Sequence, residues 1–509
     1  MKALTTKLLQ EEICLFTRSN IYYSIYAIGL SICIWIFYKY NYPYPNLTFD
    51  SYHYIMNMHL DTNAAGWPVG YSKFIKYLGY ISHSANLLPT IQYFCTQLGF
   101  LFFFITFRTI FRTGKWLSFT IFLFLFINPI NIFGSNHILS DPLYIGISMI
   151  WITQIIWIIF RFKSYMVISQ ALLLLILFDL RYNALYLPLI TVFAFLVARI
   201  KPLWKIAGII LSIILIELLI QYTSTEMEKI AGVRQYAYSN GWKQASNGLY
   251  IYEHYYKNEK APLPIKFREL DSTVRNYFNN PHPNVSLLYP DKEITLGSYY
   301  MAVGGTPLYT YMQQKSGYKD WSLDFHRTAP YGPLYRAYGN YLILHHLPGY
   351  FKFVVYPHLL SYITPYPEIF TENAEAFSLW TDDNYGKVAR DWYNIGTLKV
   401  PNNYIKLRAN ILYPFPFIYS VIHIVFILTL TIFVFLRGFI FLDKVLTYCM
   451  IILIMMILGN LLFTILSTTS VLRYQPTIIA IEFSLSAYFV NFFLFYEHTR
   501  PKISNALNQ

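Results

Sequence analysis

The chain has 509 residues, of which 55% are hydrophobic and only 13% are charged, and its formal net charge is +13. Soluble globular proteins carry about 25% charged residues, so this composition excludes a disordered chain and a small disulfide scaffold, and it argues against a soluble multidomain enzyme. The excess of basic over acidic residues fits either a protein that binds nucleic acid or a membrane protein with Lys and Arg at the cytoplasmic ends of its helices. The positions of the basic residues favour the membrane protein.

The hydropathy of the chain predicts an all-α polytopic membrane protein of about ten transmembrane helices. A mixed extracytoplasmic domain precedes the last three spans. We expect an N-terminal transmembrane domain at 1–221, the extracytoplasmic domain at 222–411, and C-terminal spans with a cytoplasmic tail at 412–509. The predicted spans are 20–38, 87–107, 117–133, 143–160, 165–179, 182–198, 203–221, 413–436, 445–466 and 474–496.

Lys and Arg in the short loops predict the orientation of the spans. Five basic residues lie on one face: Lys39, Lys73, Lys76, Arg181 and Arg473. Fifteen lie on the opposite face: Lys2, Lys7, Arg18, Arg108, Arg112, Lys115, Arg161, Lys163, Arg199, Lys201, Lys205, Arg437, Lys444, Arg500 and Lys502. This asymmetry predicts that both termini are cytoplasmic, and Lys2, Lys7 and Arg18 before an apolar run indicate an uncleaved signal anchor.

The segment 222–411 is then extracytoplasmic and long enough for a small core of its own. It has no cysteine, so no disulfide holds it. The stretch 341–363 is apolar with His and Lys interspersed, which fits a helix on the membrane surface. A buried helix of the outer domain fits equally well. The dense tyrosines between 299 and 341 fit either an interfacial belt or stacking on sugar rings.

Charges that the orientation rule does not explain gather on the outer face, where charged residues near a membrane are costly and usually functional. They come from four separate loops: Asp50, His53, His59 and Asp61; His137 and Asp141; Asp179 and Arg181; and Arg473. Their common side of the membrane predicts an active site there.

Each acidic candidate has a structural alternative. A carboxylate at Asp50 could accept a proton from an acceptor hydroxyl, or it could form an ordinary Asx turn in a solvated loop. Asp141 lies between Ser140 and Pro142 at the start of a span, where a helix cap is expected. A residue that caps a helix can also face an active site, so Asp141 can be both a cap and a site residue.

The arginines also have two interpretations. Arg181 could pair locally with Asp179, whereas Arg473 has no acid nearby in the sequence. Arg is suited to bidentate phosphate contacts, so the two guanidiniums could hold the phosphate of a lipid-linked substrate. Their alternative is snorkelling to lipid headgroups. Tyr182 and Tyr474 follow the two arginines directly and are expected to line the same site.

The absence of nucleotide-binding and hydrolase motifs narrows the function. The chain has no Walker loop, no GxSxG motif, no HExxH motif and no zinc-ligand spacing. The cytoplasmic loops are too short for a nucleotide-binding domain. No nucleotide cofactor is therefore expected, and an ATP-driven pump is disfavoured.

The arrangement of the outer loops resembles the GT-C class of polytopic membrane glycosyltransferases, in particular its bacterial branch similar to protein mannosyltransferases and the lipid A aminoarabinose transferase. Four motifs carry the resemblance: Asp50-Ser51-Tyr52 with Trp67-Pro68-Val69-Gly70-Tyr71, Ser140-Asp141-Pro142-Leu143, Arg181-Tyr182-Asn183, and Arg473-Tyr474. They cover residues 1–200 and 413–496 loosely, and the segment 222–411 has no counterpart.

The resemblance implies an inverting transfer of sugar from a polyprenyl-phosphate donor at the outer face. It maps the acceptor-side acid to Asp50 and the donor-phosphate ligand to Arg473, with help from Arg181. Many members carry an acidic pair in the first loop, whereas Ser51 follows Asp50 here, so a second acid must be Asp61 or Asp141. Some members use a divalent metal and others do not, so the cofactor stays unknown.

We therefore expect a membrane glycosyltransferase in a bacterial inner membrane, with Asp50 and Asp141 as catalytic residues. His53, Asp61, Arg181, Tyr182, Arg473 and Tyr474 are the expected substrate-binding residues. The acceptor is a lipid, a glycan or a protein. The alternatives are a lipid-linked glycan transporter or flippase, an outer-face polysaccharide polymerase and a receptor that has lost activity.

Overall fold

The computed structural model of the chain describes residues 17–256, 263–280, 299–317, 325–370, 384–394 and 405–507. These residues form helices joined by loops, and the only β pairing among them is two isolated bridges. The predicted all-α class is thus confirmed. The mixed secondary structure expected for 222–411 is not found in the described residues of that segment, which form helices. Its Gly and Pro signals bound short helices instead, as where Pro307 begins α15 and Gly317, with a φ of 72°, ends it.

The chain runs through three groups of helices. The first group is α2 (Arg18–Asn41), α3 (Phe49–His59), α4 (Gly70–Gly79), α5 (Leu87–Ile110), α6 (Lys115–Phe126), α7 (Pro129–Ser135), α8 (Asp141–Arg161), α9 (Tyr165–Leu180), η1 (Tyr182–Tyr186), α10 (Leu187–Val197) and α11 (Pro202–Ala231). The last group is α22 (Phe415–Phe435), η9 (Gly438–Phe441), α23 (Lys444–Ser467), η10 (Leu472–Tyr474) and α24 (Pro476–Leu507).

The middle group holds the helices of the segment between the two sets of spans. They are α12 (Ser239–Tyr255), η2 (Ile265–Phe267), α13 (Arg268–Asn279), α14 (Tyr299–Ala302), α15 (Pro307–Ser316), α16 (Phe325–Thr328), η4 (Ala329–Tyr331), α17 (Gly332–His345), α18 (Leu347–Tyr350), the π turn η5 (Phe351–Val355), α19 (Tyr356–Ile363), η6 (Glu368–Phe370), α20 (Asn384–Tyr393) and α21 (Ile405–Leu412).

Eight stretches of helix in the described residues are long and apolar enough to cross a membrane, which supports a multi-pass membrane protein. They are 18–41, 87–110, 115–135, 141–161, 202–231, 410–435, 444–467 and 476–494. The fifth and sixth predicted spans correspond to two shorter apolar helices, 165–180 and 182–197. They are separated by Arg181, whose extended backbone ends α9.

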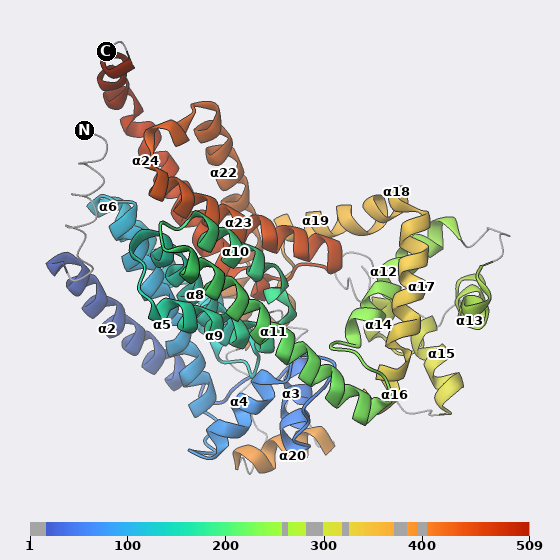
Figure 1. Cartoon of the computed structure of the whole chain (residues 1–509). Helices are drawn as coiled ribbons and strands as arrows, with labels where there is room; N and C mark the ends of the chain where they lie inside the picture. The colour runs from blue at the N-terminus through green and yellow to red at the C-terminus, as the bar shows by residue number, and fades with distance from the viewer. Residues whose placement is uncertain are drawn as a thin grey trace.

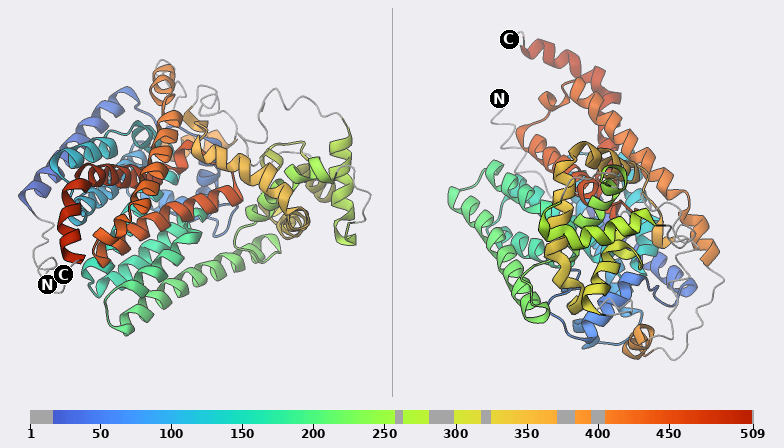
Figure 2. Two further views of the ribbon diagram at one scale, coloured as in Figure 1. Left: turned by 90° about the horizontal axis from the view of Figure 1, so that it is seen from above. Right: turned by 90° about the vertical axis from the view of Figure 1, so that its right-hand side faces the viewer.

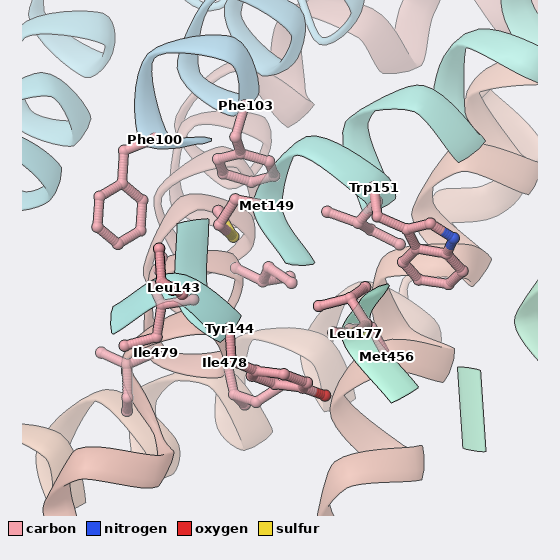
Figure 3. Packing of buried hydrophobic residues seen from close by; sticks show 14 of the residues in the cluster. Phe100, Phe103, Leu143, Tyr144, Met149, Trp151, Leu177, Met456, Ile478 and Ile479 are labelled. Carbon is pink, nitrogen blue, oxygen red and sulfur yellow. The ribbon is translucent and has the colours of Figure 1, made fainter. Parts of the chain in front are cut away.

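Helices α5 and α8 pack against each other closely enough to fix the start of α8. A Cβ on Gly99 would stand 2.4 Å from the carbonyl oxygen of Gly146, so only glycine permits this approach. The hydroxyl of Thr96 donates to the carbonyl of Pro142 at 2.8 Å. Figure 3 shows Phe100 and Phe103 in the buried core with Met149 and Trp151. This packing holds the outer end of α8 in one place.

The segment between the spans divides between two cores. A lobe beside the bundle, built from α12–α18, has its own aromatic core at residues 242–355 (Figures 1 and 2). The residues that follow belong to the bundle instead: Ile369, Phe370, Ala389, Tyr393 and Leu412 lie in the main core. The later part of 222–411 therefore packs over the ends of the spans where the charged candidates lie.

Candidate active site at the ends of the spans

Backbone contacts tie the loop before α3 to the loop before α8. The amide of Asn46 donates to the carbonyl of Asn136 at 2.9 Å, and the amide of Ile138 donates to the carbonyl of Asn46 at 3.0 Å. The buried side chain of Gln92 donates to the carbonyls of Ser135 and His137, both at 2.9 Å. These bonds place the start of α3 beside the start of α8.

A second set of bonds ties the loop between α23 and α24 to the end of α19 and the segment after it. The amide of Leu472 donates to the carbonyl of Tyr366 at 2.9 Å. Gln475 donates from its side chain to the carbonyl of Tyr362 at 2.7 Å. The turn that carries Arg473 is thus held against the turn that carries Glu368.

Arg473 lies at the centre, where these loops converge, and binds three carboxylates. Its Nη2 is 2.9 Å from Asp50 Oδ2, and its Nη1 is 3.0 Å from Asp141 Oδ2. Its Nε is 2.8 Å from Glu368 Oε2. The Arg473 side chain is only 8% exposed, whereas those of Asp50 and Glu368 are 26% and 35% exposed. The two acids therefore reach the open side of the cluster.

Arg181 joins the same cluster through Asp141. Its Nη1 is 2.6 Å from Asp141 Oδ1, so this carboxylate bridges the two guanidiniums. Both guanidiniums lie over the ring of Tyr474, with centroid distances of 4.5 Å for Arg181 and 4.8 Å for Arg473. Arg181 pairs with Asp141 and not with its sequence neighbour Asp179, because its extended backbone turns the side chain away from α9.

Burial and charge act together on the ionisation of this cluster. Burial alone would raise the pKa of Asp50, but the charge and hydrogen bond of Arg473 outweigh it and hold that pKa below its usual value. Burial would likewise lower the pKa values of Arg473 and Arg181, but the surrounding carboxylates raise both. Counted as formal charges, the three carboxylates and two guanidiniums leave one negative charge in excess.

Neighbouring residues explain two features of the motifs. Ser51, where the resemblance suggested a second acid, caps its helix: its Oγ accepts from the amide of Thr48 at 2.8 Å. Ser140 does not cap α8 with its side chain, and its Oγ is 3.0 Å from the hydroxyl of Tyr54 instead. The expected cap at the start of α8 is thus absent, since Asp141 is used by the arginines.

His53 lies one helical turn after Asp50 and is buried against Trp67, with ring centroids 4.4 Å apart. Burial lowers the pKa of His53 to about 4, although the charge of Asp50 opposes this. The ring is therefore neutral at physiological pH. Its Nε2 is buried and has no hydrogen-bond partner within the described residues.

Two of the predicted substrate-binding residues lie apart from the cluster. Asp61 is exposed and binds Lys73 and Lys76, both at 2.7 Å. The hydroxyl of Tyr182 donates to the carbonyl of Gly66 at 3.2 Å, which secures the first outer loop. Of the two candidates for a second acid, the structure thus brings Asp141 to Asp50 and leaves Asp61 outside.

Two charged residues at or near the cluster, Glu368 and Arg408, were not predicted from the sequence. Glu368 has a φ of 45°, a conformation that non-glycine residues rarely adopt and that clusters at functional sites. Arg408 is 2% exposed and donates to the carbonyl of Ile369 at 3.3 Å. The only sequence signal was Glu368 itself, an acid after Pro365 and Pro367 at the end of an apolar stretch.

A small pocket adjoins the cluster between α7, α8 and η6. Its lining includes Thr96, Asn131, Ser135, Asp141, Phe370 and Arg473. Among the described residues, no group of three or more His, Cys, Asp or Glu side chains is arranged to hold a metal ion. Comparison of the chain with protein-family models, with curated proteins and with solved structures gave no match.

Proposed function

We propose that the protein transfers a sugar from a polyprenyl-phosphate donor to an acceptor hydroxyl at the outer face of the membrane. The observation that carries this proposal is the convergence of Asp50, Asp141, Arg181 and Arg473 from four separate loops. A purely structural ion pair needs only two partners. This cluster combines carboxylates, which can accept a proton from a hydroxyl, with guanidiniums, which can bind a phosphate. The class resemblance in the same loops supplies the donor.

Arg181 is the better placed of the two arginines to bind the donor phosphate. Its bonds to protein acceptors use Nη1 alone, and within the described residues Nε and Nη2 make no hydrogen bond. Arg473 uses all three nitrogens on carboxylates. Arg181 would therefore contact the phosphate directly, and Arg473 would join it when a substrate displaces Asp50 or Glu368.

The reaction breaks the bond between the sugar C1 and the phosphate oxygen and forms a bond from C1 to the acceptor oxygen. The leaving polyprenyl phosphate gains negative charge, which the two guanidiniums stabilise. The acceptor hydroxyl loses its proton to Asp50, which is ionised and partly open to solvent. Attack from the side opposite the phosphate inverts the configuration at C1. Asp141 binds both arginines and so fixes their positions relative to each other.

The test is donor turnover by the purified full-length protein in lipid nanodiscs. A panel of polyprenyl-phosphate sugars is supplied with membrane extract as acceptor, and released polyprenyl phosphate is measured. We expect Asp50→Asn to lose about 10²–10⁴-fold in rate. Asp61→Asn is the matched control, since it makes the same change at the other end of α3, and it should keep the rate. Equal rates for both variants, or no turnover of any donor, would overturn the proposal.

A lipid-linked glycan transporter is the second candidate, and one observation favours it. His423 of α22 and Glu482 of α24 are both buried within spanning helices, with Nδ1 2.7 Å from Oε2. Ionisable residues inside a membrane commonly mark a transport pathway. If His423→Gln abolished translocation of a labelled lipid-linked glycan across vesicles while Asp50→Asn did not, the transporter would replace the transferase.

A further inference from the structure

The segment after α17 exposes a continuous apolar face. It consists of α18, the π turn η5 and α19, and its exposed apolar residues are Leu347, Phe351, Tyr356 and Leu360. Successive members are four, five and four residues apart. The step of five falls across the π turn, whose wider hydrogen-bonding pattern brings residues five apart onto one side. A regular α-helix would have turned Tyr356 away from Phe351.

The opposite face fixes the segment to the outer end of α23. The hydroxyl of Tyr350 donates to the carbonyl of Leu466 at 2.6 Å. The ring Nδ1 of His358 lies 3.1 Å from the carbonyl of Ile465. These bonds use carbonyls from the last turn of α23. The orientation of the apolar face relative to the bundle is thus fixed.

The apolar face continues the lipid-facing surface of the bundle. Leu458, Leu462 and Leu466 form an exposed stripe along the outer half of α23, 44–53% exposed, and this helix is apolar enough to span the membrane. Lys352 is exposed beside Phe353, with its Nζ 5.1 Å from the ring centroid. Lys and Tyr beside large apolar residues are typical of helices at a membrane surface.

We propose that 347–360 lies on the outer leaflet, with Leu347, Phe351 and Tyr356 inserted among the lipid headgroups and upper acyl chains. The partner of this surface is the bilayer itself. The chain reaches Glu368 eight residues after Leu360, and Glu368 binds Arg473. The segment therefore sets the depth of the charged cluster relative to the headgroups. If the proposed function holds, a phosphate attached to a membrane lipid meets Arg181 and Arg473 without leaving its leaflet.

The test measures immersion with spin labels on the full-length protein in lipid nanodiscs. Labels are attached to Leu347→Cys and Phe351→Cys, in a background whose native cysteines are replaced. The matched control is Ile265→Cys, an exposed apolar residue in the lobe (77% exposed). Relaxation by oxygen reports lipid exposure, and relaxation by a water-soluble nickel chelate reports exposure to water. Tyr356→Cys replaces either variant that does not fold.

We expect the labels at 347 and 351 to respond at least several-fold more to oxygen, relative to nickel, than the label at 265. Equal responses at all three positions would overturn the proposal. So would labels at 347 and 351 that neither reagent reaches, because a second copy or another protein would then cover the face. The measurement does not involve sugar transfer, so the lipid contact and the proposed activity can fail separately.

Discussion

The two ends of helix α3 carry two ion-pair clusters that differ in burial and not in distance. Asp50, at the start of the helix, binds Arg473 at 2.9 Å, and Asp61, just after its end, binds two lysines at 2.7 Å. The partners of Asp61 follow it closely in the sequence and its side chain is 55% exposed. The partner of Asp50 lies 423 residues away and is 8% exposed.

The comparison shows that contact distance alone does not identify a functional charge. An exposed ion pair contributes little to stability, because water and salt screen it and two long side chains lose freedom. Removing one partner of a buried cluster leaves the other charges uncompensated in a poorly solvated place. Substitutions should therefore separate the two clusters by both stability and activity.

The largest effect is expected at Arg473. Arg473→Met keeps much of the side-chain volume but leaves Asp50, Asp141 and Glu368 close together without their shared cation. We expect the free energy of unfolding to fall by roughly 3–5 kcal/mol, measured by thermal unfolding in detergent. The deficit should shrink as the pH falls, because Asp50 loses the cation that holds its pKa down and therefore takes up a proton more readily. A variant as stable as the wild type at pH 7 would show that Arg473 does not stabilise the three carboxylates around it.

The next largest effect is the pH dependence at His53. Its pKa is about 4 in the folded protein and about 6.5 in an unfolded chain, so the unfolded chain binds the proton more readily. The stability contribution is full above pH 6.5 and is lost as pH falls towards 4. Between pH 7 and pH 4.5 the free energy of unfolding of His53→Gln should therefore fall by on the order of 2–3 kcal/mol less than that of the wild type. Identical pH profiles would contradict this account.

A smaller effect is expected at Glu368, which is partly exposed. Glu368→Gln keeps an oxygen that can accept from Arg473 Nε but removes the charge. We expect the transfer rate to fall about tenfold, equivalent to about 1.4 kcal/mol, while thermal stability changes little. A rate equal to that of the wild type would make Glu368 a structural residue of the turn.

The smallest effect is expected at Asp61. Its two lysine partners lower its pKa to about 2, so its stabilising effect is present above about pH 4 and is lost only as pH falls towards 2. Because water and salt screen this exposed ion pair, Asp61→Asn should lower the melting temperature at pH 7 only slightly and leave the transfer rate unchanged. A large loss of activity would instead return Asp61 to the site and change the choice of second acid.

The sequence by itself determined the long apolar helices, because an apolar run is a local property of the chain. The short helices of 222–411, where a mixed domain was expected, did not follow from it. The charge asymmetry of the sequence also marked one face, from which Asp50, Asp141, Arg181 and Arg473 were singled out. The number of spanning helices is less sharply defined, since the 165–180 and 182–197 helices are short for a membrane.

Only the tertiary structure decided which charges meet. Asp141 binds Arg473 across 332 residues, Arg181 turns from Asp179 to Asp141, and Glu368 enters the cluster from a segment whose sequence showed no motif. The structure also assigned the described residues after 369 to the bundle core and not to the lobe. The physical reason is that a buried ion pair depends on helix packing, such as the Gly99–Gly146 approach that fixes α8, and no local pattern encodes such contacts.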